Sequence, residues 1–371
     1  FRPFVYRTAK KQGLAGYVLN RPEGVIVEIE GPADRIRAFM ETVRGCAPPL
    51  AQISGLTEAS VPVGGEPDFT IIESESDGKG EVHISPDIAT CPGCLAELFN
   101  AADRRFRYPF INCTDCGPRL TIISGIPYDR FNTSMSVFPL CAECLAEYKD
   151  PADRRFHAEP NACDLCGPSL SLLDENGNSV SCNDVLDSAC EILDDGKVLA
   201  VKGIGGFHLA VNARDGGAVQ RLRLRKYREE KPLALMVRNL EEANRIANIG
   251  AGDTDLLLSP QRPIVLVKKK YGAIAPEAAP GMANLGIMLP YSPLHHLLLE
   301  KLPCLVMTSG NQVDEPVCIK NDEALRRLSG IADYFLVHDR EILVRCDDSI
   351  AVSAAGSSRI IRRSRGFAPR P

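Results

Sequence analysis

Four CxxC pairs, arranged as two copies of one segment, constrain this chain more than any other feature of its sequence. Residues 91–120 aligned on residues 141–170 match at 15 of 30 positions, so the segment repeats with a period of 50 residues. Within each copy 18 residues separate the two pairs, and 24 residues separate the last cysteine of the first copy from the first cysteine of the second. A unit this small and this rich in cysteine cannot bury an adequate core, so it needs a staple to hold it together.

Each copy supplies four cysteines at a spacing that suits a tetrahedral metal ion. The pattern predicts two structural Zn²⁺ ions, each held by the four thiolates of one copy with no open position. The predicted ligands are Cys91, Cys94, Cys113 and Cys116 in the first copy and Cys141, Cys144, Cys163 and Cys166 in the second. Iron–sulfur clusters suit two evenly repeated, self-contained units less well, and a thioredoxin-like redox motif lacks its βαβ context. The remaining cysteines are predicted to be buried thiols, namely Cys46, Cys182, Cys190, Cys304, Cys318 and Cys346.

The composition is that of an ordinary globular protein with two or three domains. The chain has 371 residues, of which 44% are hydrophobic and 25% charged. No apolar run reaches the ~18 residues of a membrane span and no signal peptide opens the chain, so no membrane contact is expected. The formal net charge of −5 argues against a globally basic nucleic-acid binder, and double-stranded DNA is an unlikely partner. Paired cysteines without a secretion signal indicate a reducing compartment, so a cytoplasmic protein is expected.

Residues 1–73 are predicted to form a small α+β domain. The expected elements are, in order, a helix-like stretch at 8–12, strands at 14–20 and 24–30, a helix with Ile36, Phe39, Met40 and Val43 on one face, and a strand at 69–72. This order matches a split βαβ sandwich without its first strand. The acidic segment at 73–81, rich in Ser and Gly, is predicted to be a linker.

Residues 180–371 are predicted to form an α/β domain with a mixed or parallel sheet, because buried strands alternate with helices. Helices are expected at 185–193, 218–225, 241–248 and 293–299, and strands at 198–201, 233–237, 264–267, 304–307 and 334–337. Gly203, Gly205 and Gly206 after the first strand give a weak phosphate-loop signal and are more typical of a tight strand-to-helix turn. The tandem cysteine modules are predicted to span residues 88–170, between the two α/β-containing domains.

A basic cluster precedes the strand at 233–237. Its members are Arg221, Arg223, Arg225, Lys226, Arg228 and Lys231. Charge alone favours a solvated helix end. The cluster nevertheless leads directly into a buried strand. This places Lys226, Arg228 and Lys231 at the end of that strand, where fixed cations can bind a polyphosphate. Small polar residues also follow the strand at 304–307, where they suit a ligand crevice or an ordinary turn, namely Thr308, Ser309 and Asn311.

Three further groups have open interpretations. An acyl phosphate needs a guanidinium for its charged oxygens and an amide to orient a water, which Arg2 and Asn20 could supply, although each alone is an ordinary surface residue. His295 and His296 are adjacent on one helix and point in different directions, so one core-facing and one exposed histidine is expected. The basic tail is equally typical of a solvated linker and of a lid over a phosphate, and comprises Arg359, Arg362, Arg363 and Arg365.

In this order, these motifs resemble the HypF family of hydrogenase-maturation carbamoyltransferases. Residues 1–5 are similar to the latter half of the family's acylphosphatase signature, and the two cysteine copies are similar to its double zinc module. The basic cluster and the turn at 309–311 resemble the nucleotide-binding signature of YrdC/Sua5-type domains. The family's glycine-containing loop before Phe1 and its large C-terminal carbamoyl-transfer domain have no counterpart here, so an N-terminal fragment is expected.

The resemblance implies a fold and a reaction. The fold is a ferredoxin-like acylphosphatase sandwich lacking its first strand, two small four-cysteine zinc modules, and an α/β YrdC-like domain with a twisted mixed sheet. Carbamoyl phosphate is hydrolysed in the first domain, where Arg2 binds phosphate and Asn20 orients the water. The carbamate then attacks the α-phosphate of ATP, bound with Mg²⁺, to give carbamoyl-adenylate. The carbamoyl group is destined for a HypE-type maturation protein and the cyanide ligands of nickel–iron hydrogenase.

The resemblance also implies a set of nucleotide-binding residues, namely Lys226, Arg228, Lys231, Thr308, Ser309, Asn311 and Arg362. Two alternatives remain open. A threonylcarbamoyl-adenylate synthase of tRNA modification would share the nucleotide signature but leaves the zinc modules and the acylphosphatase-like front unexplained. A non-enzymatic zinc docking module would account for the cysteines alone.

Overall fold

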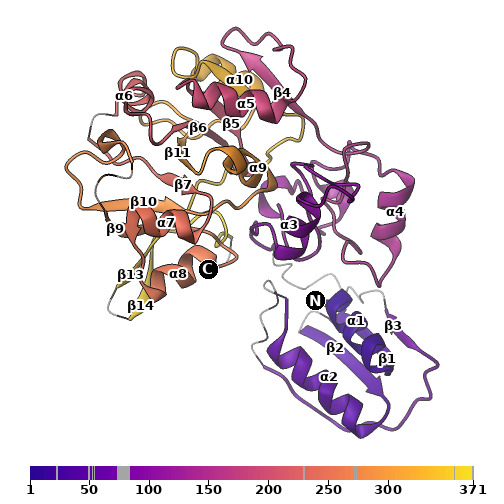
Figure 1. The fold of residues 1–371 in the computed structure, drawn as a ribbon. Helices are drawn as coiled ribbons and strands as arrows, with labels where there is room; N and C mark the ends of the chain where they lie inside the picture. The colour runs from indigo at the N-terminus through magenta and orange to yellow at the C-terminus, as the bar shows by residue number, and fades with distance from the viewer. Residues whose placement is uncertain are drawn as a thin grey trace. The chain divides into compact units, whose positions relative to one another are not determined.

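A computed structural model describes residues 1–21, 24–48, 51, 53, 55–72, 84–228, 230–270, 272, 274–354 and 356–369 (Figure 1). The chain divides into two compact units, which are considered separately. The first comprises Phe1–His83, Cys113–Asp115 and Leu140–Asn161, and the second comprises Ile84–Asn112, Cys116–Pro139 and Ala162–Pro371. The linker predicted at 73–81 lies outside the described residues.

The first unit contains the predicted order of helix, two strands, helix and strand. These elements are α1 (Arg2–Gln12), β1 (Ala15–Arg21), β2 (Gly24–Glu30), α2 (Ala33–Gly45) and β3 (Phe69–Ile71), and α4 (Ala142–Lys149) follows later in the chain. Strand β1 pairs antiparallel with β2 and parallel with β3, giving the order β2-β1-β3. The predicted acylphosphatase-like sandwich is thereby confirmed.

Helix α1 begins earlier than the sequence pattern predicts. Helix was expected from residue 8, whereas α1 starts at Arg2 with a proline in its first turn. Proline is tolerated there because the N–H that it lacks has no partner inside the helix. The helix ends where Gly13 adopts a left-handed conformation with φ of 63°. Val5 and Ala9 from α1 pack in one buried cluster with Phe39 from α2, one helical turn before the buried Val43.

The second unit is built on a large mixed sheet. Its described strands run in the order β14-β13-β9-β10-β7-β11-β6-β5-β12-β4, with β8 beside β9. Their bounds are β4 Leu170–Asp174, β5 Leu199–Lys202, β6 Phe207–Asn212, β7 Leu235–Val237, β8 Ala247–Asn248, β9 Ile264–Lys269, β10 Asn284–Met288, β11 Cys304–Ser309, β12 Tyr334–His338, β13 Ile350–Ala354 and β14 Ser357–Arg362. Parallel pairing joins β7 to β10, β5 to β12 and β9 to β13, and the other pairs are antiparallel. The sheet is therefore mixed, as predicted.

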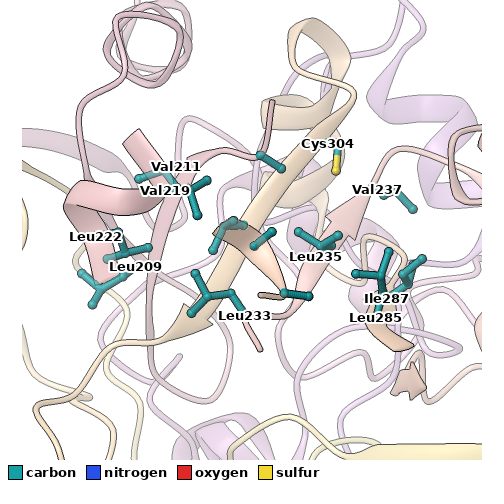
Figure 2. Close-up of a cluster of buried hydrophobic side chains, with 14 of the residues drawn as sticks. Leu209, Val211, Val219, Leu222, Leu233, Leu235, Val237, Leu285, Ile287 and Cys304 are labelled. Carbon is teal, nitrogen blue, oxygen red and sulfur yellow. The ribbon is translucent and has the colours of Figure 1, made fainter. Parts of the chain in front are cut away.

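Helices accompany this sheet and the cysteine-rich segment. They are α3 Pro92–Leu98, α5 Val185–Asp194, α6 Gly216–Arg225, α7 Leu240–Ile246, α8 Ala251–Leu258, α9 Pro293–Lys301 and α10 Asn321–Arg327, with short 3₁₀ turns at Leu120–Ile122, Arg130–Asn132 and Pro276–Ala278. Figure 2 shows the buried cluster that joins helix to sheet, with Val219 and Leu222 of α6 beside Leu209 and Val211 of β6. Burial of these apolar side chains fixes α6, and with it the basic segment that follows.

The glycine-rich segment after β5 is a different turn from the predicted one. A strand-to-helix turn was expected at residues 203–206, but the chain turns back into β6, which pairs antiparallel with β5. Gly203 N donates to the Gly206 carbonyl at 2.9 Å, closing the turn. A side chain on Gly205 would overlap the Cys346 carbonyl oxygen at 2.2 Å, so glycine is needed there for close packing. The glycines thus serve a hairpin.

The six cysteines outside the CxxC pairs are not all buried. Cys190, Cys304, Cys318 and Cys346 are buried as predicted, and burial raises the pKa of the Cys304 thiol to about 12. Cys46 is exposed, because it caps the solvent end of α2, and Cys182 is half-buried in the connection between β4 and α5. No helix in the described part of the chain has the length and apolar character to span a membrane.

Candidate functional site

Helix α6 delivers the basic residues to the end of β11. The helix is capped by the Asp215 side chain, which accepts from Ala218 N at 3.0 Å, and it ends at Arg225, with Lys226 as its C-cap residue. Lys226 Nζ donates to the Ser309 carbonyl at 2.7 Å, to the Asn311 carbonyl at 2.6 Å and to Asn311 Oδ1 at 3.0 Å. Burial, and then the charge of Arg228, lower the pKa of Lys226 to about 8. Lys226 therefore ties the basic segment to the polar turn after β11.

Arg223 organises the segment that carries the other cations. Its side chain is buried within α6 and donates to the carbonyls of Arg228 at 2.7 Å, Lys231 at 3.1 Å and Ala278 at 3.1 Å. It also donates to the Glu277 carbonyl. Several bonds from one rigid guanidinium fix the backbone on both sides of the loop. Arg223 therefore positions the loop, and it does not line the cavity that lies between this loop and the end of β11.

A cavity of about 250 Å³ lies where these elements meet. Its polar lining comes from three sources: the segment after α6, the end of β11, and the chain on either side of the β13–β14 hairpin. The polar lining residues are Arg228, Lys231, Thr308, Ser309, Asp347, Asp348 and Arg362. Its apolar wall includes Leu233, Ile264, Leu266 and Met307. A mostly apolar wall with a few convergent charges is typical of a small-molecule site.

Cations dominate the polar side of this cavity. Arg228 Nη1 donates to Thr308 Oγ1 at 3.2 Å and Nη2 donates to the Pro232 carbonyl at 3.0 Å. Its buried Nε has no hydrogen-bond partner among the described residues. Burial, and then the charge of Arg362, lower the pKa of Arg228. An anion in the cavity would relieve both the unmet donor and the repulsion between the two arginines.

Two adjacent aspartates also line the cavity, and both pair with basic residues. Asp347 Oδ2 forms an ion pair with Arg362 Nη1 at 2.9 Å. Asp348 Oδ1 accepts from Arg365 Nε at 2.8 Å, and its Oδ2 lies 2.9 Å from His208 Nε2. Burial opposes ionisation of Asp348, but the charge of Arg365 and the hydrogen bond with His208 outweigh it and hold the carboxyl pKa well below its usual range. This buried network anchors the chain that carries Arg362.

The sequence-predicted nucleotide residues divide into two groups. Arg228, Lys231, Thr308, Ser309 and Arg362 line the cavity. Lys226 and Asn311 lie behind it, bonded to each other and to the turn after β11. Ser309 Oγ donates to Asn311 Oδ1 at 2.7 Å. The sequence analysis did not identify Asp347, Asp348, His208 or the structural role of Arg223; an Asp-Asp pair two residues before a strand was the available signal.

The basic tail is neither a linker nor a simple lid. Arg359 is exposed on β14, and Arg362 reaches the cavity from the end of that strand. Arg365 is 1% exposed and its guanidinium lies 3.3 Å from the centroid of the Tyr291 ring. The ion pair with Asp348 explains that burial.

The prediction of one core-facing and one exposed histidine is confirmed only in part. His295 is fully buried, while His296 is half-buried and not exposed. Burial lowers the pKa of His296 to about 4. Both ring nitrogens of His295 are without a hydrogen-bond partner in the described structure, and its ring packs edge-on against Tyr291 at 4.5 Å. Neither histidine belongs to a group of potential metal ligands in the described residues.

The two predicted acyl-phosphate residues lie toward one end of the first unit's sheet. Arg2 Nη1 donates to the Ile72 carbonyl at 3.4 Å, just beyond β3. Ile72 N in turn donates to the Val18 carbonyl on β1 at 3.0 Å. Asn20 lies two residues further along β1, opposite Val25 of β2, and its side chain is outside what the structure describes. The backbone therefore brings Asn20 near the same sheet end as Arg2.

The eight CxxC cysteines form two groups of four, as the repeat predicts. One group is Cys91, Cys94, Cys113 and Cys116, and the other is Cys141, Cys144, Cys163 and Cys166. The sulfurs of each group all lie within 4.8 Å of one another. Cys94 and Cys116 Sγ are 3.5 Å apart and Cys163 and Cys166 Sγ are 3.7 Å apart, near the roughly 3.8 Å edge of a tetrahedron with metal–sulfur bonds of about 2.3 Å.

Backbone amides support the thiolate form in the first group. Cys94 N donates to Cys91 Sγ at 3.5 Å, and Asp115 N donates to Cys113 Sγ at 3.4 Å. Such donors are common around metal-bound thiolates and orient them. Both groups thus fit a closed, four-sulfur metal site.

Comparison with known proteins covers the same three parts of the chain. The Acylphosphatase family matches residues 1–71, and the HypF finger family matches residues 90–123 and 140–173. The Sua5/YciO/YrdC family, described as Telomere recombination, matches residues 191–364.

Full-length relatives match the whole chain. Carbamoyltransferase HypF2 of Cupriavidus necator is 50% identical over 392 residues, and Carbamoyltransferase HypF of Synechocystis is 50% identical over 374 residues. Each match covers 100% of this chain and 49% of the relative. A crystal structure of full-length HypF in a phosphate- and nucleotide-bound form superposes with a TM-score of 0.89 at 49% identity, again covering 100% of this chain and 49% of that one. The chain spans about half the length of the curated relatives it matches, and over that length it belongs to the HypF carbamoyltransferase family.

Proposed function

We propose that this chain forms carbamoyl-adenylate from carbamoyl phosphate and ATP. The observation that carries the proposal is the cavity of about 250 Å³ in which Arg228, Lys231 and Arg362 face the hydroxyls of Thr308 and Ser309. Three cations beside small hydroxyl donors suit a triphosphate, and the apolar wall suits a nucleoside. A HypF relative that is half covered by this chain was crystallised in a phosphate- and nucleotide-bound form, which supports the assignment.

In the proposed reaction, a carbamate oxygen attacks the α-phosphorus of ATP. The bond from that phosphorus to the bridging oxygen of the β-phosphate breaks, and pyrophosphate leaves with the bonding electron pair. Arg228, Lys231 and Arg362 offset the charge that develops on the leaving phosphates. Lys226 and Asn311 hold the turn that presents Ser309 to the nucleotide. The lining holds two carboxylates, and because Asp348 is bonded to Arg365 and lies against His208, Asp347 is the one that would contact a Mg²⁺ ion carried by ATP.

The carbamate is proposed to come from the first unit. There, water attacks carbamoyl phosphate and yields carbamate and inorganic phosphate, with Arg2 binding the phosphate and Asn20 orienting the water. Support comes from the acylphosphatase match over residues 1–71 and from the backbone, which brings both residues toward one end of the sheet. Carbamate is short-lived in water, so use within the same protein protects it.

The wider setting follows from the family. We propose that the carbamoyl group passes to a HypE-type maturation protein, and that the metal in each four-cysteine group is a structural Zn²⁺ ion. We further propose that the protein acts in the reducing cytoplasm, where the cysteines of both groups stay available to a metal ion. The proposed setting and partner are properties of the complete family protein, of which this chain corresponds to about half.

Isotope exchange tests the proposal. The chain is incubated with ATP, Mg²⁺, carbamoyl phosphate and labelled pyrophosphate, and label entering ATP is counted. Exchange that requires carbamoyl phosphate supports carbamoyl-adenylate formation, and Arg228→Met is expected to reduce it about 100-fold or more. Arg326→Met, on the exposed face of α10, is the matched control and should leave exchange within about twofold.

The two alternatives predict other outcomes. A threonylcarbamoyl-adenylate synthase would require threonine with bicarbonate and would ignore carbamoyl phosphate. A zinc docking module would show no exchange with either substrate while retaining its metal. Either result would overturn the proposed reaction.

A further inference from the structure

A second, smaller cavity in the same unit contains charges that the proposed ATP site does not use. It is lined by residues 109–111 and 117–118 of the first cysteine copy, by the turn after β5, by the start of α9 and by the end of β12. Its volume is about 20 Å³, which admits a ligand of only a few atoms and excludes a nucleoside. Its charged lining residues are Lys202 and Arg340, and no carboxylate belongs to the lining.

Arg340 is the most unusual of these groups. It is 5% exposed, and its guanidinium makes no hydrogen bond with any described residue, although it lies 5.1 Å from the centroid of the Phe110 ring. Burial lowers its pKa to about 10. Two acids lie near it: Asp87 Oδ1 accepts from Arg119 N at 2.7 Å while Asp87 Oδ2 has no hydrogen-bond partner among the described residues, and Asp339 Oδ1 accepts from Ser169 N at 2.9 Å. Neither acid belongs to the lining of the cavity. A buried guanidinium that lines a cavity without a carboxylate in its lining favours an anionic ligand there.

Lys202 adds a second cation at the same cavity. It is 4% exposed, and its Nζ donates to the His338 carbonyl at 2.9 Å. An ammonium carries three protons, so two remain for a ligand. Burial, and then the charge of Arg340, lower the pKa of Lys202 to about 8, so the two cations act on each other.

The positive end of a helix faces the same space. Ser292, Pro293 and Leu294 line the cavity at the start of α9, and Ser292 caps this nine-residue helix by accepting from His295 N. Partial positive charge at a helix N-terminus favours a negatively charged ligand. The two buried cations therefore favour an anion, and the helix start adds a partial positive charge on the same side.

We propose that Arg340 and Lys202 bind a small planar oxyanion of the carboxylate class, and that carbamate occupies this position on its way to ATP. The identity of the physiological ligand rests on the proposed function, whereas the anion site itself rests on the two buried cations. A planar carboxylate can accept two parallel bonds from the edge of one guanidinium, which matches Arg340. The small volume favours a group of three or four heavy atoms over tetrahedral phosphate.

Anion-dependent stability tests the site with probes that last in solution. Bicarbonate and formate serve as planar probes, and phosphate and chloride are compared at equal ionic strength. The melting temperature of the chain should rise with bicarbonate or formate through mass action on the folded state, by more than it rises with chloride. The rise should vanish in Arg340→Met and remain in Arg326→Met, the exposed control on α10.

Crystals of the unmodified chain provide a measurement that does not depend on a variant folding. Soaking in formate should give planar density bonded to the Arg340 guanidinium and the Lys202 ammonium. Density only for phosphate at this position, an empty cavity at saturating formate, or an unchanged melting response in folded Arg340→Met would each overturn the proposal.

The site and the proposed reaction can fail separately. If the carboxylate site alone is correct, the probes bind but labelled pyrophosphate does not enter ATP. If the reaction alone is correct, exchange proceeds and Arg340→Met has the same KM for carbamoyl phosphate as the unmodified chain. When both hold, Arg340→Met binds Mg–ATP within about twofold of normal, yet its carbamoyl phosphate-dependent exchange falls about tenfold or more.

Discussion

Among single residues, Arg223 shows how a buried cation can serve a site that it does not touch. Its guanidinium bonds the carbonyls of Arg228 and Lys231 and so fixes the loop on which the cavity depends. In Arg223→Met those carbonyls lose their buried donor, and we expect ATP affinity to fall about tenfold or more, or about 1.4 kcal/mol. Arg221→Met on the same helix, whose side chain bonds the Gly196 carbonyl instead, should change affinity by less than about threefold in the same calorimetric titration. Equal affinities in the two variants would contradict the positioning role.

Lys226 gives the site a pH dependence at the residue scale. Its pKa in the folded chain is lowered to about 8, so the ammonium is charged at pH 7 and becomes neutral as the pH rises through 8. Because the charge strengthens its three bonds to residues 309 and 311, ATP affinity should fall between pH 7.5 and pH 9. The same burial makes the charged form costly to fold: the full cost is present below pH 8, and it declines as the pH rises from about 8 toward the unfolded pKa of 10.5. In Lys226→Arg the charge persists, so a titration series should show a flatter profile; an identical decline in both proteins would exclude Lys226 as its source.

Residue types near the site could be predicted from sequence, but their partners could not. Six clustered cations before a buried strand predicted a polyphosphate-binding edge, and five of the seven proposed residues line one cavity. The sequence could not distinguish Arg228, which lines the cavity, from Arg223, which supports the loop, because both are arginines in the same basic cluster. Asp348 and Arg365 are 17 positions apart, and His208 is 140 positions from Asp348, so no local pattern marks their buried network.

At the scale of elements, hydrophobic periodicity located the elements better than it located their ends. Helix α1 starts at Arg2 because proline is compatible with a first helical turn. The hairpin after β5 was not predicted, because its second strand gives no alternating pattern in the sequence. That strand, Phe207–Asn212, is buried on both faces and therefore shows no alternation of apolar and polar residues. The short strand β10 was missed because it carries glycine in its middle.

The cysteine modules are the elements for which the sequence was most informative. Four sulfurs per group at near-tetrahedral separations predict two zinc ions per chain by elemental analysis. Cys94→Ser and Cys144→Ser should each retain about one ion, and chelation should leave both copies sensitive to protease, because metal binding supplies their folding free energy. Cys46→Ser, exposed and outside both groups, should keep two. A full zinc complement in Cys94→Ser would show that the group is not a metal site.

At the scale of the whole molecule, the chain matches three families, and their combination suits a reaction that passes through a reactive intermediate. The acylphosphatase match supports the proposed hydrolysis of an acyl phosphate, and the Sua5/YciO/YrdC match covers the unit that contains the proposed ATP site. The predicted domain limits at 1–73, 88–170 and 180–371 remain predictions, since each cysteine copy contributes residues to both compact units. Sequence order could predict the combination of domain types, whereas the small cavity proposed to bind an anion required the fold, because it draws on residues from 109 to 340.

The central claim is that the cavity beside β11 binds ATP through Arg228 and its neighbours. Calorimetric titration of the zinc-loaded chain with Mg–ATP tests it most directly, with Arg326→Met as the folded control. The account predicts one nucleotide per chain, with affinity reduced about 100-fold in Arg228→Met and unchanged in the control. Heat of binding that is absent in the unmodified chain, or that is equal in Arg228→Met and the control, would contradict it.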